Sequence, residues 1–296
     1  MLKILLFFSA LLVSDFIFSQ SKPDPKYFNE VPPDTSPKVF APGRISKENE
    51  FEFGAVFSND RTEFYYGVEI AGKAETRMMK FENGSWSSAV TILSHEVYSY
   101  NDPFLTLDNK KLFFISDRPL SGSGPKKDYD IWYVERQAGT WSEPKNAGRN
   151  INTDKDEYYI SFTKSGKMYF SSNKPDKNGV NNFDIYSSEL KDGEFQPPIK
   201  LGVEINTSSY EADVYIAPDE SYVVFSANRP GGLGQGDLYV SFRKKDGTWS
   251  PSKSLGNTIN TNTDDFCPYV SPDGKYLFYA SRKDIYWVST DVLKKL

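Results

Sequence analysis

The stretch Ser-Pro-Asp-Gly-Lys at 271–275, followed by Tyr-Leu-Phe-Tyr at 276–279, decides the fold because it recurs along the chain. It joins a tight polar turn to a short apolar strand. Related copies occupy residues 217–225, 163–170, 106–114 and, in a degenerate form, 58–66. One turn-and-strand unit repeated in this way indicates a repeat architecture.

Other landmarks keep the same spacing. Ile-Asn pairs begin at residues 151, 205 and 259, so they are 54 residues apart. Gly-x-aromatic turns end at Trp86, Trp141, Phe195 and Trp249, with spacings of 55, 54 and 54 residues. Segments that begin with Asp130, Asp184, Asp237 and Asp284 supply a further strand in each unit. Four short strands at a period near 50 are typical of a propeller blade.

The repeat predicts an all-β, five-bladed β-propeller of four-stranded blades that spans residues 36–296. Five innermost strands are expected, at 53–58, 103–107, 158–163, 212–217 and 266–271. The last unit ends near residue 289 without a fourth strand, and residues 36–45 resemble the fourth-strand region at 250–259. We therefore expect the N-terminal strand to join the last blade, which closes the ring and removes open sheet edges.

The N-terminus resembles a secretory signal peptide. Lys3 precedes an apolar run at 4–12, and small or polar residues follow near Ser19. The run is interrupted by Asp15 and is too short to span a bilayer comfortably. We expect residues 1–19 to be a cleaved signal peptide, residues 20–35 to be a linker, and the protein to be periplasmic, without a membrane span.

The composition limits the classes of molecule that this protein is expected to bind. The net charge is −5, which argues against nucleic acid because such binding needs a basic surface. Cys267 is the single cysteine, so export brings no internal disulfide. We expect a monomer whose partner is a small oligosaccharide. No cofactor is required by any motif, although a divalent cation is possible, with ligands unknown.

The turn motif, the Ala-Asn-Arg-Pro-Gly-Gly stretch at 227–232 and the Gly-Asp-Leu-Tyr that begins at Gly236 resemble the TolB-like family of WD-type propeller repeats. The resemblance covers residues 36–289. It implies a periplasmic propeller in a family that includes scaffolds, peptidase propeller domains and oligouronide lyases. Most members have six or seven blades, so a five-bladed ring departs from the family pattern.

Two rings of residues are expected where the innermost strands begin. The first ring is Glu52, Tyr100, Glu157, Glu211 and Asp265, and the second ring, two residues later, is Gly54, Asp102, Tyr159, Asp213 and Cys267. The two-residue period of a strand places both rings on the side nearest the axis. Two interpretations stay open: carboxylates that cap backbone amides of the neighbouring blade, or a polar funnel that binds sugar hydroxyls or a metal.

The only histidine, His95, lies near Tyr98 and Tyr100 in the connection between the first two blades. Arg44 and Arg149 lie in equivalent connections, which are expected on the same face. These residue types could supply a base and a cation that neutralises a sugar carboxylate. We predict His95, Tyr98 and Tyr100 as catalytic residues. The predicted substrate-binding residues are Arg44, Arg149, Glu52, Asp102, Glu157, Tyr159, Glu211, Asp213 and Asp265.

Three functions are compatible with these residues. The resemblance and the residues on the predicted face favour β-elimination on uronic-acid oligosaccharides in polysaccharide degradation, by a lyase or dehydratase. A non-catalytic binding or scaffold propeller of the cell envelope is the first alternative. The second alternative is glycoside hydrolysis by a central carboxylate pair.

Overall fold

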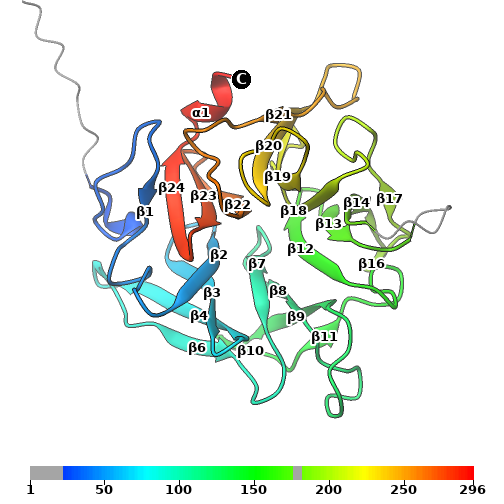
Figure 1. Cartoon of the computed structure of the whole chain (residues 1–296). Helices are drawn as coiled ribbons and strands as arrows, with labels where there is room; N and C mark the ends of the chain where they lie inside the picture. Colours follow the sequence, from blue (N-terminus) through cyan, green and yellow to red (C-terminus); the bar gives the residue numbers. More distant parts are fainter. Residues whose placement is uncertain (1–22, 176–181) are drawn as a thin grey trace, which may run out of the picture.

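The computed structural model describes residues 23–175 and 182–296, and these form a propeller of five blades around a central axis (Figure 1). The predicted signal peptide lies outside the described residues. In the described part of the chain, no helix is long and apolar enough to cross a membrane. The all-β fold, the number of blades and the closure of the ring are as the repeat predicted.

Each blade begins with its innermost strand and continues outward through antiparallel neighbours. Blade 1 contains β2 (Phe51–Phe57), β3 (Glu63–Ile70), β4 (Lys73–Glu82), β5 (Ser85–Trp86) and β6 (Val90–Leu93). Blade 2 contains β7 (Asn101–Leu105), β8 (Lys111–Ser116), β9 (Asp130–Gln137), β10 (Thr140–Trp141) and β11 (Lys145–Asn146). Blade 3 contains β12 (Glu157–Phe162), β13 (Met168–Ser172), β14 (Asp184–Ser188), β15 (Leu190–Lys191), β16 (Glu194–Phe195) and β17 (Ile199–Lys200). Blade 4 contains β18 (Tyr210–Ile216), β19 (Tyr222–Asn228), β20 (Asp237–Phe242) and β21 (Lys253–Ser254).

Blade 5 joins both ends of the chain. It contains β22 (Asp265–Val270), β23 (Tyr276–Ser281), β24 (Asp284–Ser289) and the N-terminal β1 (Lys38–Val39). β1 pairs antiparallel with β24, and Lys38 lies opposite Trp287. A short helix, α1 (Asp291–Lys294), follows β24. This shared blade closes the ring, so β24 is not left as an open edge.

The repeated Ile-Asn pair has a structural role in three blades. Asn152 accepts a hydrogen bond from the Ile131 N–H and donates one to the Ile131 carbonyl, both at 2.8 Å. Asn206 forms the same two hydrogen bonds with Ile185, and Asn260 forms them with Leu238. Each Asn therefore satisfies two buried backbone groups in the third strand of its blade, at the point where the chain leaves for the next blade.

The segment expected to be a linker packs onto the propeller. It contains the 3-10 turn η1 (Pro25–Tyr27), and Tyr27 is only 1% exposed. Phe28 stacks on Trp86 with ring centroids 4.3 Å apart. The segment therefore joins blades 5 and 1 through its aromatic side chains, and we refer to it as the N-terminal arm. Sequence analysis did not predict this contact, because no repeat landmark extends into the segment.

Candidate functional site

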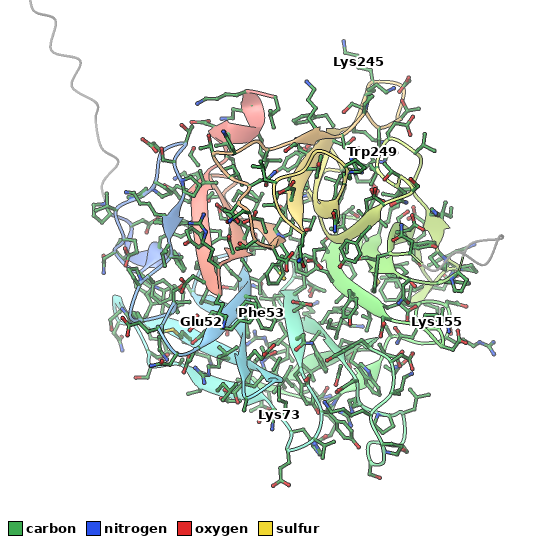
Figure 2. The ribbon with its side chains drawn as sticks, viewed as in Figure 1. Glu52, Phe53, Lys73, Lys155, Lys245 and Trp249 are labelled. Atoms are coloured by element: carbon green, nitrogen blue, oxygen red, sulfur yellow. The ribbon has the colours of Figure 1, made fainter. Side chains whose placement is uncertain are left out.

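The acids of the first ring hold the loops that enter their own strands. Glu52, Glu157, Glu211 and Asp265 are 0% exposed. Each accepts a hydrogen bond from a backbone N–H four or five residues earlier; the donors are Lys47, Thr153, Thr207 and Thr261, at 3.2, 3.0, 3.0 and 2.6 Å. Figure 2 shows Glu52 beside Phe53 on β2, well inside the rim that carries Lys155 and Lys245. These acids cap amides, but in their own entry loops rather than in the neighbouring blade.

Burial raises the pKa of Glu52 and of Glu157 to about 7, although the loop amides lower it. Tyr100 breaks the acidic pattern and packs on Phe114 instead, with ring centroids 5.3 Å apart. In that blade Asp117 takes over the capping role, because its carboxylate accepts the Ser99 N–H at 2.8 Å. The first ring is thus enclosed by the loops that it stabilises.

The second ring sits on a bulge that recurs in every innermost strand. Gly54, Asp102, Tyr159, Asp213 and Cys267 all have positive φ, of 62°, 48°, 43°, 52° and 50°. The pairing register of each innermost strand shifts around this position. A left-handed conformation is costly for residues other than glycine, and such bulges are frequent beside functional sites.

Side chains of the second ring meet across the axis. The Cys267 thiol in blade 5 donates to Asp102 Oδ1 in blade 2 at 3.3 Å. The Tyr159 hydroxyl in blade 3 donates to the Pro268 carbonyl in blade 5 at 2.9 Å. Blades 2 and 5, like blades 3 and 5, are not neighbours, so these bonds bridge the centre of the ring. These bonds close the centre of the ring, and we call the second ring the floor.

The floor carries two interacting acids, Asp102 and Asp213. Asp102 is 8% exposed and Asp213 is partly buried. Burial, followed by the negative charge of Asp102, raises the pKa of Asp213 to about 8. Burial also raises the pKa of Asp102 to about 6, while the Cys267 thiol lowers it. The pair therefore holds a proton more tightly than two exposed carboxyls would.

Aromatic side chains surround this acid pair. We define the aromatic collar as Phe51, Tyr129, Tyr158, Phe183, Tyr210 and Phe266. The collar consists of two groups of rings in contact. Tyr129 and Tyr158 lie 5.3 Å apart, Tyr158 and Phe183 5.2 Å, and Phe183 and Tyr210 5.3 Å; Phe51 and Phe266, 6.0 Å apart, form the other group.

The collar is accessible and lies near the acids. Tyr210 is 37% exposed, and the other five rings are partly buried. Burial raises the pKa of Tyr158 and of Tyr210, and the charges of Asp102 and Asp213 raise both further. This coupling places Tyr158 and Tyr210 within electrostatic reach of the acid pair.

The predicted catalytic residues contact groups other than the acid pair. His95 is exposed and stacks on Tyr98, with ring centroids 4.5 Å apart. The Val97 N–H donates to His95 Nδ1 at 3.0 Å, so the neutral ring carries its proton on Nε2. The buried Tyr98 donates its hydroxyl to the Gly124 carbonyl at 2.7 Å. His95 and Tyr98 are therefore together, whereas Tyr100 packs on Phe114.

The two predicted arginines contact different blades. Arg44 donates to the Trp86 carbonyl at 2.7 Å, and its guanidinium lies 5.1 Å from the Phe28 ring centroid, beside the N-terminal arm. Arg149 lines a groove between blades 2 and 3. Among the residues that the structure describes, no group of three or more His, Cys, Asp or Glu side chains could hold a metal ion.

Sequence reasoning missed the aromatic collar and the partnership of Cys267 with Asp102. The collar was visible in part, since Phe51, Tyr158, Tyr210 and Phe266 each adjoin a residue of the first ring in the sequence. The thiol–carboxylate contact joins residues 165 positions apart, and nothing in the local sequence indicates it.

No protein-family model matches the chain, and no curated protein matches it. Solved structures show the propeller fold at low identity. TolB from Acinetobacter baumannii matches with a TM-score of 0.50 and 15% identity, over 80% of this chain and 53% of TolB. The chain thus spans about half the length of that TolB.

For two glycoside hydrolases the match covers a larger share of the matched protein than it does for TolB. A thermostable family-43 glycoside hydrolase matches with a TM-score of 0.56 and 14% identity, over 82% of this chain and 91% of that protein. A further glycoside hydrolase matches with a TM-score of 0.59 and 12% identity, over 86% and 90%. This chain is therefore a β-propeller that resembles TolB and glycoside hydrolase propellers in fold.

Proposed function

We propose that this protein is a carbohydrate-active propeller that hydrolyses a glycosidic bond with Asp102 and Asp213. One observation carries the proposal: two carboxyls from different blades, with pKa values raised unequally, lie beneath an accessible aromatic collar. Glycoside hydrolysis classically uses one protonated and one ionised carboxyl. The fold resemblance to two glycoside hydrolases supports the same chemistry.

The unequal pKa values suggest a role for each acid. Asp213, with its pKa raised to about 8, keeps its proton at neutral pH and would protonate the leaving oxygen. Asp102 would act as the ionised carboxylate, either by activating water or by attacking the sugar. Rings such as Tyr158 and Tyr210 present flat apolar faces on which a sugar ring can lie.

β-Elimination on uronic-acid oligosaccharides is the second candidate. It is favoured by the exposed His95 stacked on Tyr98. However, the Val97 N–H occupies Nδ1, so neutral His95 offers a donor at Nε2 rather than a base. Hydrolysis is the better-supported reaction for this reason. In either case we propose an exported, periplasmic monomer that acts on short oligosaccharides, since one central floor offers a single small binding surface.

The test combines two readouts on purified protein with a panel of neutral and acidic oligosaccharides. New reducing ends measure bond cleavage, and near-ultraviolet absorbance detects the alkene that elimination leaves. We expect new reducing ends without absorbance, and a loss of about 100-fold or more in kcat for Asp102→Asn and for Asp213→Asn. Asp246→Asn, in an outer turn of blade 4, is the matched control and should keep full activity.

Three results would overturn the proposal. Cleavage accompanied by absorbance would assign elimination instead. Full activity in both Asn variants would remove the acid pair from the chemistry. Binding of a sugar without any product would make the protein a non-catalytic binding propeller.

A further inference from the structure

We call the contact surface between two neighbouring blades a seam. The seam between blades 1 and 2 shows which side chains join two blades. Trp141 of blade 2 packs edge-on against Tyr65 of blade 1, with ring centroids 6.2 Å apart. The Arg136 guanidinium lies 4.4 Å from the Trp141 ring centroid and forms an ion pair with Glu63 at 2.6 Å. An indole, a guanidinium and a carboxylate together fill the seam.

The seam between blades 3 and 4 repeats this design. Trp249 occupies the same position, and Arg243 lies 4.8 Å from its ring centroid. Across the seam, the Tyr169 hydroxyl of blade 3 donates to Glu220 of blade 4 at 2.7 Å. Two seams are therefore sealed by an indole with an arginine stacked on it.

The seam between blades 2 and 3 lacks these parts at every equivalent position. Lys111 begins β8 where Glu63 begins β3, and Phe113 replaces Tyr65. Leu190 pairs with Phe195 in the outer hairpin, as Arg136 pairs with Trp141. A smaller ring and an uncharged chain thus replace the indole and the guanidinium. Leu190 is left 43% exposed, and a groove of about 680 Å³ lies at this seam.

The groove has an aromatic floor. Phe113 and Phe162 lie 4.7 Å apart, Phe162 and Phe195 lie 6.3 Å apart, and Phe113 and Tyr133 lie 5.2 Å apart. A volume of about 680 Å³ falls within the range of roughly 300–1,000 Å³ that is usual for ligand sites. The groove is therefore large enough, and apolar enough, for an aromatic side chain with its flanking backbone.

The rim of the groove is mainly cationic. Four basic side chains line it, Lys110, Lys111, Arg149 and Lys164, against two acidic ones, Asp108 and Glu194. Lys111 is already paired with Glu135 at 3.3 Å and lies over the Tyr133 ring, and Lys110 is paired with Asp108 at 3.9 Å, which leaves Arg149 and Lys164. Asp108 is held by its own turn, because it accepts bonds from the Thr106 hydroxyl and the Lys110 N–H. A ligand with carboxylates would complement the remaining positive charge.

The protein itself shows what kind of group fills such a seam. Between blades 5 and 1 lies the N-terminal arm, the segment that contains η1 and Phe28. It packs against Trp86, which donates its indole N–H to the Pro25 carbonyl at 2.9 Å. Phe28 of the arm stacks on the Trp86 ring nearly in parallel, with an interplanar angle of 6°. A polypeptide segment bearing an aromatic residue therefore already occupies one seam of this ring.

We propose that the groove between blades 2 and 3 binds an acidic segment of a partner protein. An aromatic side chain of that segment rests on the floor formed by Phe113, Phe162 and Phe195. Its carboxylates face Arg149 and Lys164. This surface is separate from the acid pair at the axis, so it does not depend on the hydrolase proposal.

The test uses a fluorescein-labelled peptide, acetyl-Asp-Glu-Trp-Glu-Asp-amide, in fluorescence polarisation with the full chain. We expect a dissociation constant in the micromolar range that rises with salt, because the contacts with the rim are screened. A peptide with Asn and Gln in place of the acids, and another with Ala in place of Trp, should each bind at least tenfold more weakly.

Variants assign the binding to this groove. Phe195→Trp installs the ring that fills the seams between blades 1 and 2 and between blades 3 and 4, and it should weaken binding at least tenfold while the melting temperature stays equal or rises. Lys164→Glu reverses one rim charge and should weaken binding without filling the groove, which covers the case in which Phe195→Trp does not fold. Lys245→Ala is the matched control, since Lys245 is exposed at the rim of blade 4 (Figure 2).

Two results would overturn the proposal. Equal binding of the acidic and the neutralised peptides, or unchanged binding by Phe195→Trp and Lys164→Glu, would show that the groove is not the site. Displacement of the peptide probe by an oligouronide of equal charge, with tighter binding of that sugar, would assign the groove to a glycan and not to a protein segment.

Discussion

Replacement of Tyr27 by Ala tests whether the N-terminal arm is part of the core. Tyr27 is 1% exposed, and its ring contacts Phe57 and Tyr276 at centroid distances of 5.4 and 5.0 Å. Its hydroxyl donates to Asp273 Oδ1 at 2.7 Å, and the Arg61 guanidinium lies 4.9 Å from its ring centroid. One side chain therefore ties the arm to both blade 1 and blade 5.

The expected cost follows from these contacts. Truncation of a buried aromatic side chain to Ala typically costs about 3–5 kcal/mol. The variant also leaves the Arg61–Asp273 ion pair, at 3.3 Å, without the ring beneath it. We expect a loss of about 4 kcal/mol in the free energy of unfolding. For a domain of this size, about 2 °C per kcal/mol gives a fall of roughly 8 °C in melting temperature.

The assay is denaturant unfolding followed by circular dichroism, with calorimetry for the melting temperature. Tyr27→Phe keeps the ring and removes one hydrogen bond, so it should cost only about 1 kcal/mol. Lys26→Ala is the control on the same turn: Lys26 is half-buried, and the variant removes a solvent-exposed hydrogen bond from Lys26 to the Asp60 carbonyl, so it should change stability by less than about 1 kcal/mol. A Tyr27→Ala value close to that of Lys26→Ala would refute the reasoning and return the arm to the status of a linker.

Three further predictions concern the axis and the blade junctions. Because burial and Asp102 raise the pKa of Asp213 to about 8, its contribution to stability is present below the unfolded value of 3.8 and is lost as pH rises through about 8. We therefore expect the free energy of unfolding in urea to fall less for Asp213→Asn than for the parent as the pH rises from about 4 to about 8. Parallel curves for the two proteins would contradict this. Asn206→Ala should cost about 1–3 kcal/mol, since it leaves the buried Ile185 N–H unpaired, whereas the Ile185 carbonyl keeps its bond from the Leu201 N–H; a loss below about 0.5 kcal/mol in denaturant unfolding would count against that role. Gly234→Ala should cost about 2 kcal/mol or more, because its Cβ would lie 1.8 Å from the Thr263 carbonyl oxygen and force the loop between blades 4 and 5 to move. Its melting temperature, measured beside that of the parent, checks this, and an unchanged value would show that the loop yields freely.

The blades were predictable because their determinants are local. A turn such as that at 271–275 and the strand at 276–279 need only neighbouring residues to specify them. The spacing of Trp86, Trp141, Phe195 and Trp249 then gives the period, and the missing fourth strand of the last unit gives the closure. These features depend on backbone propensity and strand alternation, which can be read along one segment at a time.

The candidate site was predictable only in part. The sequence placed Asp102, Tyr159 and Asp213 on one ring, and they do lie together at the axis. It also assigned Glu157 and Glu211 to substrate binding, whereas the structure shows both carboxylates occupied by the amides of their entry loops. Strand alternation alone cannot separate the two rings, because the second ring itself lies on the bulge with positive φ, which breaks the regular pairing.

By itself, the sequence determined that this protein is a closed ring of five blades, since repeats, turns and strand periods are properties of short segments. Only the tertiary structure decided which polar groups meet. Cys267 reaches Asp102, and the arm reaches Trp86, through contacts between residues far apart in the chain. It also decided which seam stays open, because the volume left beside Phe195 depends on how two whole blades approach each other. Burial and charge at the axis arise in the same way, from blades that no local pattern brings together.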